Sequence, residues 1–491
     1  MATNNKIKTR KESDLIGTKE LPVDALYGVQ SLRGFENFKI SGETMKDYPN
    51  FIKGFAITKH GAAIANYKQG KLTKEQFDAI VKACKEMYDG KLDDNFLSDM
   101  IQGGAGTTMN MNANEVIANR GLQIMGHQPG EYKYLSPNDH INASQSTNDA
   151  YPTAFHFGLY LKTQELIDAL DAIIKSLETK AKEFKNIVKM GRTQLQDAVP
   201  MTMGQTFQAF ADSLKKEYSE LKRIREGFLT INMGATAIGT GICSEPGYSK
   251  LCVEALREIT GWNIKLDKNL IEATSDTGIL VAYSDEMKQI ALKSIKICND
   301  LRRMGSGPRC GLNELFLPEM QPGSSIMPGK VNPVIPEVMN QLCYKVIGEN
   351  TTVMLASENA QFELNVMEPI MVYSCFQCIN LLTRGFNTLR TLCIDGIRVN
   401  EARCEKEVRS SIGVVTALNP FIGYKNSTRI AEIAMKTDKG VYDIALENGI
   451  LTKKDLDTIL APKNMIQPVN LTITPNPKTK EILEDVLSKL Q

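Results

Sequence analysis

Four stretches of the chain concentrate the residue types that bind small anions. They read QGGAGTTMNMNANE (102–115), SPNDHINASQSTNDAYP (136–152), GRTQLQDAVPM (191–201) and LPEMQPGSSIMPGKVNP (317–333). Hydroxyls, amides and backbone N–H groups beside glycine can all donate hydrogen bonds to carboxylate oxygens. Each stretch alone could be a helix cap or a turn, because Ser, Thr and Asn are common there. Together, in a chain made otherwise of long helices, they predict a site for a small anionic ligand.

The fourth stretch combines backbone freedom with a cation. Its four prolines exclude a helix, and its two glycines give the latitude that is typical of a mobile lid. A lysine on a loop is usually a solvated charge, but Lys330 lies between Pro328-Gly329 and Val331-Asn332-Pro333. The local sequence therefore leaves open whether Lys330 is a solvated surface charge or a functional residue.

Composition narrows the class of protein. The 491 residues are 42% apolar and 23% charged, and 58 Lys and Arg nearly balance 57 Asp and Glu. This balance gives no reason to expect nucleic acid or an anionic membrane as a partner. The first residues are polar and lack an apolar core, so we do not expect them to act as a secretory signal. No run approaches the roughly 18 apolar residues of a transmembrane helix.

The metal-binding residue types show no ligand pattern. The ten cysteines lack the spacing of a disulfide framework, and the pair Cys375 and Cys378 lies in an apolar, helical-looking run. We therefore expect reduced cysteines that pack as small hydrophobes, and a cytoplasmic location. The four histidines, at 60, 127, 140 and 156, have no metal-ligand spacing.

Long helices must position the four stretches. Apolar residues recur at steps of three and four in 159–177 and 287–304, and 201–228, 334–358 and 362–392 are long and nearly free of Gly and Pro. This pattern predicts an all-α fold with a central bundle of long helices. A bundle this long leaves apolar stripes exposed, so we expect a homo-oligomer.

The ends of the chain differ from the middle. Residues 1 to about 50 predict short extended pieces and turns. Helices follow over 51–100, one of them beginning at Thr73 in a capping box with Gln76. The tail predicts shorter helices at 401–410, 426–436, 440–448, 453–460 and 478–490. The predicted domains are 1–142 (mixed, mostly helical), 143–396 (the bundle) and 397–491 (small and helical).

The segment GSSIMPGKVNP (323–333) resembles the signature of the fumarase/aspartase superfamily, whose lyases cleave C–N or C–O bonds and release fumarate. The other three stretches resemble the remaining active-site regions of that superfamily in the same order. The tail segment LNPFIGYKNSTRIAEIA (418–434) is also similar. The resemblance implies a three-domain helical subunit. It also implies a homotetramer in which different subunits contribute to each active site.

One position separates the branches of the superfamily. Fumarases are expected to read G-R-T-H-x-Q-D at 191–197, whereas this chain has Gln194 in place of the histidine. The run from 124 to 153 also resembles aspartases. The resemblance therefore implies that L-aspartate is converted to fumarate and ammonium. The alternatives are a class II fumarase, an argininosuccinate or adenylosuccinate lyase, and a catalytically idle structural relative.

The resemblance assigns roles to individual residues. Ser324 is the expected base, acting as an alkoxide that backbone N–H groups and Lys330 stabilise. The β-carboxylate, which becomes a doubly charged aci-carboxylate, is expected on Thr107, Ser146, Thr147 and Ser325. The α-carboxylate is expected on Lys330 and Asn332 with help from Thr193, and the amino group on Asn148, Thr107 and Gln194.

The sequence leaves open the roles of Glu337 and His140 and the need for a divalent cation. Glu337 is either a helix N-terminal charge or part of the site. His140 either belongs to a second dicarboxylate site or is part of a capped loop. The resemblance implies no required cofactor, and it leaves open an activation by a divalent cation such as Mg²⁺.

Overall fold

The computed structural model describes residues 8–490. Strands in this part of the chain form only two-stranded sheets. The pairs are β1 (Thr9–Asp14) with β2 (Gly17–Pro22), β3 (Val188–Thr193) with β4 (Gln196–Thr202), β5 (Thr230–Ile231) with β6 (Lys265–Leu266), and β7 (Leu315–Phe316) with β8 (Arg398–Val399). None of these pairs makes a layer of its own, so the predicted all-α fold class is confirmed.

The five long helices are confirmed. They are α5 (Thr147–Glu183), α6 (Met203–Arg225), α9 (Gly278–Met304), α10 (Val334–Glu358) and α11 (Glu368–Leu392). The bounds of α10 equal the predicted range, 334–358, at both ends. Helix α11 begins at Glu368 and not at 362, because Pro369 lacks an N–H donor and is tolerated only in the first turn.

The chain divides into two compact units. Unit 1 comprises 1–170, 216–292 and 341–385, and unit 2 comprises 171–215, 293–340 and 386–491. The shorter helices of unit 1 are α1 (Val29–Asn37), α2 (Pro49–Lys68), α3 (Lys74–Tyr88), α4 (Thr107–Ile124), α7 (Tyr248–Thr260) and α8 (Glu272–Ser275). The predicted capping box of Thr73 and Gln76 begins α3. The three predicted domains stay a prediction.

The N-terminal region corrects one expectation. The predicted extended structure is confirmed for the hairpin β1–β2. It is wrong for 29–37, which forms α1. The carboxylate of Glu115, from α4, accepts hydrogen bonds from the backbone N–H groups of Gly28, Gln30 and Ser31. These N–H groups lie at the start of α1, where no intrahelical acceptor exists. A distant side chain therefore caps this helix, which is why its local sequence does not predict it.

Helices α2 and α5 touch through their backbones in unit 1. A Cβ atom on Gly54 would lie 2.0 Å from the carbonyl oxygen of Ala154 and 2.8 Å from the backbone N of Gly158. The two helices also meet through aromatic rings, since Phe51 and Phe55 on α2 both pack against Tyr151 on α5. The close packing fixes the first turns of α5, which include the end of the second stretch, 136–152.

Buried polar contacts join the long helices within unit 1. The hydroxyls of Thr163 on α5 and Tyr283 on α9 lie 2.6 Å apart. On α10, the Asn350 amide donates to Ser284 on α9 at 3.0 Å, and Glu349 accepts from Ser374 on α11 at 2.6 Å. These contacts fix the helix faces relative to one another more specifically than apolar packing can.

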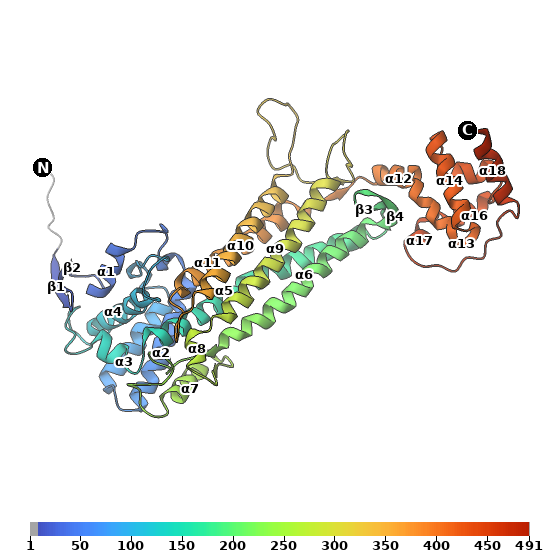
Figure 1. The fold of residues 1–491 in the computed structure, drawn as a ribbon. Coiled ribbons are helices and arrows are strands. Elements are labelled where there is room, and N and C mark those ends of the chain that lie inside the picture. The colour runs from blue at the N-terminus through green and yellow to red at the C-terminus, as the bar shows by residue number, and fades with distance from the viewer. Residues whose placement is uncertain (1–7, 491) are drawn as a thin grey trace. The chain divides into compact units, whose positions relative to one another are not determined.

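The tail of unit 2 has its own core. Its helices are α12 (Glu401–Ser410), α13 (Asn419–Ile422), α14 (Tyr424–Thr437), α15 (Val441–Glu447), α16 (Lys453–Ile459), α17 (Pro462–Met465) and α18 (Thr479–Lys489). All five predicted tail helices are present, and Figure 1 shows the short helices from α13 onward gathered in one group. Leu418, Ile430, Ile444, Leu456 and Leu483 are fully buried among them.

Two further observations bear on the predicted class of protein. All ten cysteines are free thiols, as expected, and eight of them are buried. Cys243 and Cys310 are exposed, so the expectation that the cysteines pack as small hydrophobes is wrong for these two. Among residues 8–490, we find no helix with the length and apolar character that a membrane span requires.

The contact between α2 and α5 gives a first prediction. Gly54→Ala should lower the free energy of unfolding by about 1–3 kcal/mol, because the added methyl group cannot be accommodated beside the backbone of α5. Chemical denaturation measures this change. Gly440→Ala is the control, since its new Cβ would meet only ordinary contacts at 3.5 Å or more. Equal effects of the two substitutions would contradict the packing described here.

Candidate functional site

The first stretch forms the turn before α4 and the first turns of that helix. Gly104, Ala105 and Gly106 have positive φ angles of 95°, 52° and 85° in succession, a path that favours glycine. Gly106 has a second constraint, because a Cβ atom there would lie 2.4 Å from the ring of Tyr151. The turn leaves Thr107, the first residue of α4, exposed, with its hydroxyl donating to the Gly104 carbonyl at 2.8 Å. The prediction that 102–115 interrupts the helices is thus right before Thr107 and wrong after it.

The second stretch runs into α5, so the prediction that 136–152 interrupts the helices is right before Thr147 and wrong from Thr147 to Pro152, which lie in the first turns of that helix. Ser146 immediately precedes the helix, and its hydroxyl accepts a hydrogen bond from the backbone N–H of Asn148 at 3.3 Å. Thr147 is the first helical residue, and its hydroxyl accepts from the side chain of Asn110 on α4 at 3.1 Å. The side chain of Asn148 donates to the carbonyl of Ala237 at 2.8 Å. The contact between Asn110 and Thr147 brings the first turns of α4 and α5 together.

A buried amide and a buried ammonium hold the loop before α5. Asn142 Oδ1 accepts hydrogen bonds from the side chains of Asn110 and Asn114 and from the ammonium of Lys59. Lys59 Nζ also donates to Gln145 Oε1 at 2.9 Å. Burial lowers the pKa of Lys59 to about 7, although the charge of Asp149 opposes the shift. The ammonium therefore serves the backbone of this loop from the interior.

A fully buried carboxylate fixes the loop from the other side. Asp149 accepts from the backbone N–H of Ser146 at 2.9 Å and from those of Gly234 and Thr236 at 3.0 Å each. Burial raises the pKa of Asp149 to about 6, while the three N–H donors and Lys59 act in the opposite direction. Asp149 thereby ties the start of α5 to the segment around 232–237.

These contacts place hydroxyl and amide groups together on the surface of unit 1. Both α4 and α5 begin with hydroxyl residues, and unpaired N–H groups at helix N-termini carry partial positive charge. Ser146, Thr147 and Asn148 are half-buried, so their polar atoms can be reached without being fully solvated. Such a surface can stabilise negative charge with neutral donors, and the pairing of two helix N-termini strengthens it.

The third stretch is the hairpin β3–β4 of unit 2. Thr193 pairs with Gln196, and the two tip residues, Gln194 and Leu195, have positive φ angles of 52° and 65°. This is the geometry of a tight two-residue hairpin. Thr193 and Gln194 are exposed at its tip.

The fourth stretch is a loop of unit 2, as its prolines predict. A narrow neck closes it, in which the Gly323 N–H donates to the Lys330 carbonyl at 2.7 Å and the Asn332 amide donates to the Gly323 carbonyl at 2.9 Å. The Ser324 oxygen accepts hydrogen bonds from the N–H groups of Ile326 at 3.2 Å and Met327 at 3.0 Å. This arrangement favours negative charge on the serine oxygen.

Two charged residues were singled out in this region, Lys330 in the loop and Glu337 just after it in α10. Ser325 and Lys330 are exposed, and in the described part of the chain the Lys330 ammonium has no ion-pair partner. Glu337 lies in the first turn of α10, with one oxygen 3.8 Å from Arg302. That contact supports the reading of Glu337 as a helix N-terminal charge. Among residues 8–490, no group of three or more His, Cys, Asp or Glu could hold a metal ion.

His140 is engaged within its own loop. Its Nδ1 accepts from the backbone N–H of Ser136 at 2.8 Å, and its Nε2 lies 3.1 Å from the side-chain nitrogen of Gln76. Burial lowers the pKa of this imidazole. The contacts support the capped-loop reading of His140.

The structure thus gathers the predicted residues into two sets. Thr107, Ser146, Thr147 and Asn148 belong to unit 1, and Thr193, Gln194, Ser324, Ser325, Lys330 and Asn332 belong to unit 2. Sequence reasoning missed the buried groups beneath the first set, namely Lys59, Asn110, Asn142 and Asp149. A charge inside the apolar run FIKGFAITKHGAAIAN was the available signal for Lys59.

Asp149 gives a second prediction. Asp149→Asn should lower the free energy of unfolding by about 1–3 kcal/mol, because an amide offers one acceptor oxygen and leaves at least one buried N–H unpaired. Hydrogen exchange should also become faster at the amides of Gly234 and Thr236. The control is Asp89→Asn, an exposed carboxylate paired only with Lys91. Wild-type exchange rates at these two amides and at that of Ser146 would contradict this role.

Comparisons with known proteins place the chain in a family. A family model described as lyase matches residues 17–348, and one described as fumarase C C-terminus matches residues 414–467. The chain is 52% identical to an aspartate ammonia-lyase of Pseudomonas aeruginosa, covering 94% of this chain and 97% of that protein. It is 51% identical to the aspartate ammonia-lyase of Escherichia coli K12, with coverage of 94% and 96%.

Solved structures agree with the sequence relatives. A fumarate lyase:delta crystallin from Brucella melitensis bound to cobalt has a TM-score of 0.92 and 45% identity, over 94% of this chain and all of that chain. A recombinant class II fumarase from Schistosoma mansoni has a TM-score of 0.88 and 32% identity, with the same coverage. With its helical fold, its ordered motifs and these relatives, the chain belongs to the fumarase/aspartase superfamily of lyases.

Proposed function

We propose that the protein is an aspartate ammonia-lyase that converts L-aspartate reversibly to fumarate and ammonium. The observation that carries this proposal is the pairing of two helix N-termini, α4 and α5, whose first residues offer uncharged donors to an anion. Identity of 51–52% to aspartate ammonia-lyases over 94% of the chain supports the choice of substrate. Gln194 in place of the histidine expected in fumarases supports the same branch.

The chemistry requires charge to build up on the β-carboxylate. Removing a proton from Cβ of aspartate places a second negative charge on the adjacent carboxylate, as an aci-carboxylate. A site that binds this dianion better than the ground state accelerates the reaction. In the proposed mechanism, Thr107, Ser146, Thr147 and Ser325 donate hydrogen bonds to it. Neutral donors suit this task because they do not hold the ground-state carboxylate in a permanent ion pair.

Ser324 is the proposed base. Its oxygen must be an alkoxide to take the Cβ proton, and the N–H groups of Ile326 and Met327 that donate to it support that form. The C–N bond then breaks, and its electron pair leaves with the nitrogen. Ammonia departs and takes up the proton that Ser324 removed from Cβ, which restores the serine alkoxide, so that the atoms of L-aspartate equal those of fumarate and ammonium. No strong general acid is needed.

The other end of the substrate meets the remaining residues. In the proposal, Lys330 supplies charge to the α-carboxylate and Asn332 supplies direction, with help from Thr193. Asn148, Thr107 and Gln194 receive the amino group. In the proposal, protein side chains carry out every step and no cofactor is required, and activation by a divalent cation such as Mg²⁺ stays an open question. We also propose a cytoplasmic location, which the free cysteines support.

Two assays and one variant test the reaction. The purified protein should release fumarate, followed by its ultraviolet absorbance, from L-aspartate and not from L-malate. Ser324→Ala should lower kcat by at least about 10³-fold, because residues that act as a base typically contribute 10²–10⁴-fold and no other group can replace this one. Ser488→Ala, an exposed serine on α18, should keep the wild-type rate. Fumarate from L-malate alone would show a fumarase, and an active Ser324→Ala would refute the base.

We further propose a homotetramer whose active sites combine motif stretches from different subunits. Helix α10 carries a face of Tyr344, Gly348, Thr351 and Leu355, which are exposed and uncharged. Tyr344 and Leu355 are 56% and 52% exposed, and a Cβ on Gly348 would meet nothing within 4 Å. A small residue between large apolar ones allows close approach of another helix, and burial of this face against a second copy would remove it from water.

The face of α10 gives a prediction about assembly. Wild-type protein should sediment as a tetramer, and Leu355→Glu should dissociate it and abolish activity, because an unpaired carboxylate is costly in an apolar interface. Met435→Glu is the control, since Met435 is 69% exposed on α14. Analytical ultracentrifugation measures both. A monomeric wild type, or a tetrameric Leu355→Glu, would contradict the proposal.

A further inference from the structure

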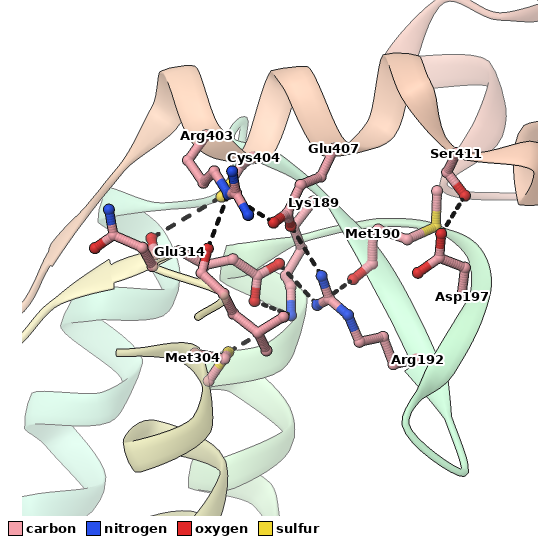
Figure 2. A network of polar contacts seen from close by, with 12 residues as sticks. Lys189, Met190, Arg192, Asp197, Met304, Glu314, Arg403, Cys404, Glu407 and Ser411 are labelled. Carbon is pink, nitrogen blue, oxygen red and sulfur yellow. Dashed lines mark hydrogen bonds and ion pairs between the residues drawn. The ribbon is translucent and has the colours of Figure 1, made fainter. Parts of the chain in front are cut away.

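A network of charges lies at the base of the hairpin β3–β4 (Figure 2). The Arg192 guanidinium donates through Nη1 to Glu314 Oε1 at 2.9 Å and through Nη2 to Glu407 Oε2 at 2.8 Å. The Glu314 side chain is completely buried, and Lys189 Nζ lies 3.4 Å from its second oxygen. The two ends of one planar fork thus bind two different carboxylates.

The network joins three segments of unit 2 that are far apart in sequence. Arg192 immediately precedes Thr193 on β3. Glu314 immediately precedes β7, just before the 317–333 loop. Glu407 lies on α12. The Glu314 backbone is also fixed, since its N–H donates to the Met304 carbonyl and its carbonyl accepts from the Asn400 N–H, each at 2.8 Å.

Helix α12 has further contacts with both neighbours. Arg403 Nε donates to Glu407 Oε1 at 2.8 Å and to the Leu312 carbonyl at 3.0 Å. Just beyond the helix, the Ser411 hydroxyl donates to Asp197 on β4 at 2.8 Å, as Figure 2 shows. The hairpin, the segment before the loop and α12 are therefore connected by charged and polar contacts at several points.

The tip of the hairpin has little else to fix its position. Thr193, Gln194, Leu195 and Gln196 are all exposed, and the tip is a two-residue turn. At the base of the hairpin Glu314 and Lys189 are buried, and Arg192 and Glu407 are partly buried, so solvent screens their contacts less than those of exposed charges. Burial acts to lower the pKa of Arg192, but Glu314 and Glu407 raise it more, so this side chain stays charged. The direction in which β3 leaves this base sets where Thr193 lies.

We propose that Arg192 and Glu314 are positioning residues for the reaction, which hold Thr193 and Gln194 at a fixed place relative to the attachment of the 317–333 loop. Glu407 extends this control to α12, so that the small C-terminal helices share in aligning the site. The inference rests on the proposed function, in which Thr193 helps to bind the α-carboxylate of L-aspartate. None of the three charged side chains needs to touch the substrate.

A double-mutant cycle tests the proposal. Arg192→Lys keeps the positive charge but loses the fork, so it cannot bind both carboxylates. It should lower kcat/KM for L-aspartate by roughly 10- to 100-fold, since small displacements of a binding group have effects of that order. On a Thr193→Val background, the same substitution should cost less than about 3-fold, because groups that act as one unit are not additive.

A matched control separates positioning from stability. In unit 1, the Arg120 guanidinium donates to both carboxylate oxygens of Glu86. Arg120→Lys removes this bidentate geometry at a place that is not among the candidate residues. It should leave kcat/KM within about 2-fold of the wild type, as expected for independent sites. Thermal unfolding of every variant is measured alongside. Equal losses from Arg192→Lys on both backgrounds, or a loss no larger than that of Arg120→Lys, would overturn the proposal.

A replacement variant and a separate assay of the wild type make the test decisive. If Arg192→Lys does not fold, Glu407→Gln replaces it in the same cycle, because that variant keeps the shape of the side chain and the pair of Arg192 with Glu314. A failure of the proposed function is seen separately, as a wild-type protein that does not release fumarate from L-aspartate. The cycle is then run on whichever substrate the wild type converts, and the same criteria apply.

Discussion

The buried ammonium group of Lys59, in the middle of α2, binds two side chains of the loop that leads to the candidate hydroxyls at the start of α5. Lys59 is 1% exposed, and its hydrogen bonds run to two amide oxygens of the loop before α5. Burying a charge is costly unless it is paired and fully hydrogen-bonded. Burial lowers the pKa of Lys59 to about 7, and the charge of Asp149 acts in the opposite direction. Lys59 and Asp149 bind the loop between Asn142 and Ser146 from two sides.

The rest of unit 1 supports that arrangement. Gly54 lets α2 approach the backbone of α5 closely, which brings the Lys59 helix next to the start of α5. Gly106 lets the turn before α4 lie on the ring of Tyr151. Both glycines are explained by close approach and not by flexibility. The outcome is a rigid surface of neutral donors, which suits the stabilisation of charge that appears only during the reaction.

Unit 2 presents its candidate residues differently. Ser324 and Lys330 lie on a loop that is closed by a few backbone contacts at its neck, and most of its residues are exposed. Thr193 and Gln194 lie on an exposed turn whose base is held by buried charges. An exposed loop can move to admit substrate, whereas a hairpin anchored by Arg192 and Glu314 cannot move far. The proposed division of labour is therefore a mobile base and a fixed binding group.

The sequence by itself determined the long helices, the two ends of α10 and the family. Helical periodicity is a local property, and the signature GSSIMPGKVNP is specific enough to stand alone. It could not determine α1, because the acceptor for its first N–H groups is Glu115, which is distant in sequence. It could not show that Lys59, Asp149 and Arg192 support the candidate residues. Their partners lie across the fold, and only tertiary structure decides which buried charges meet.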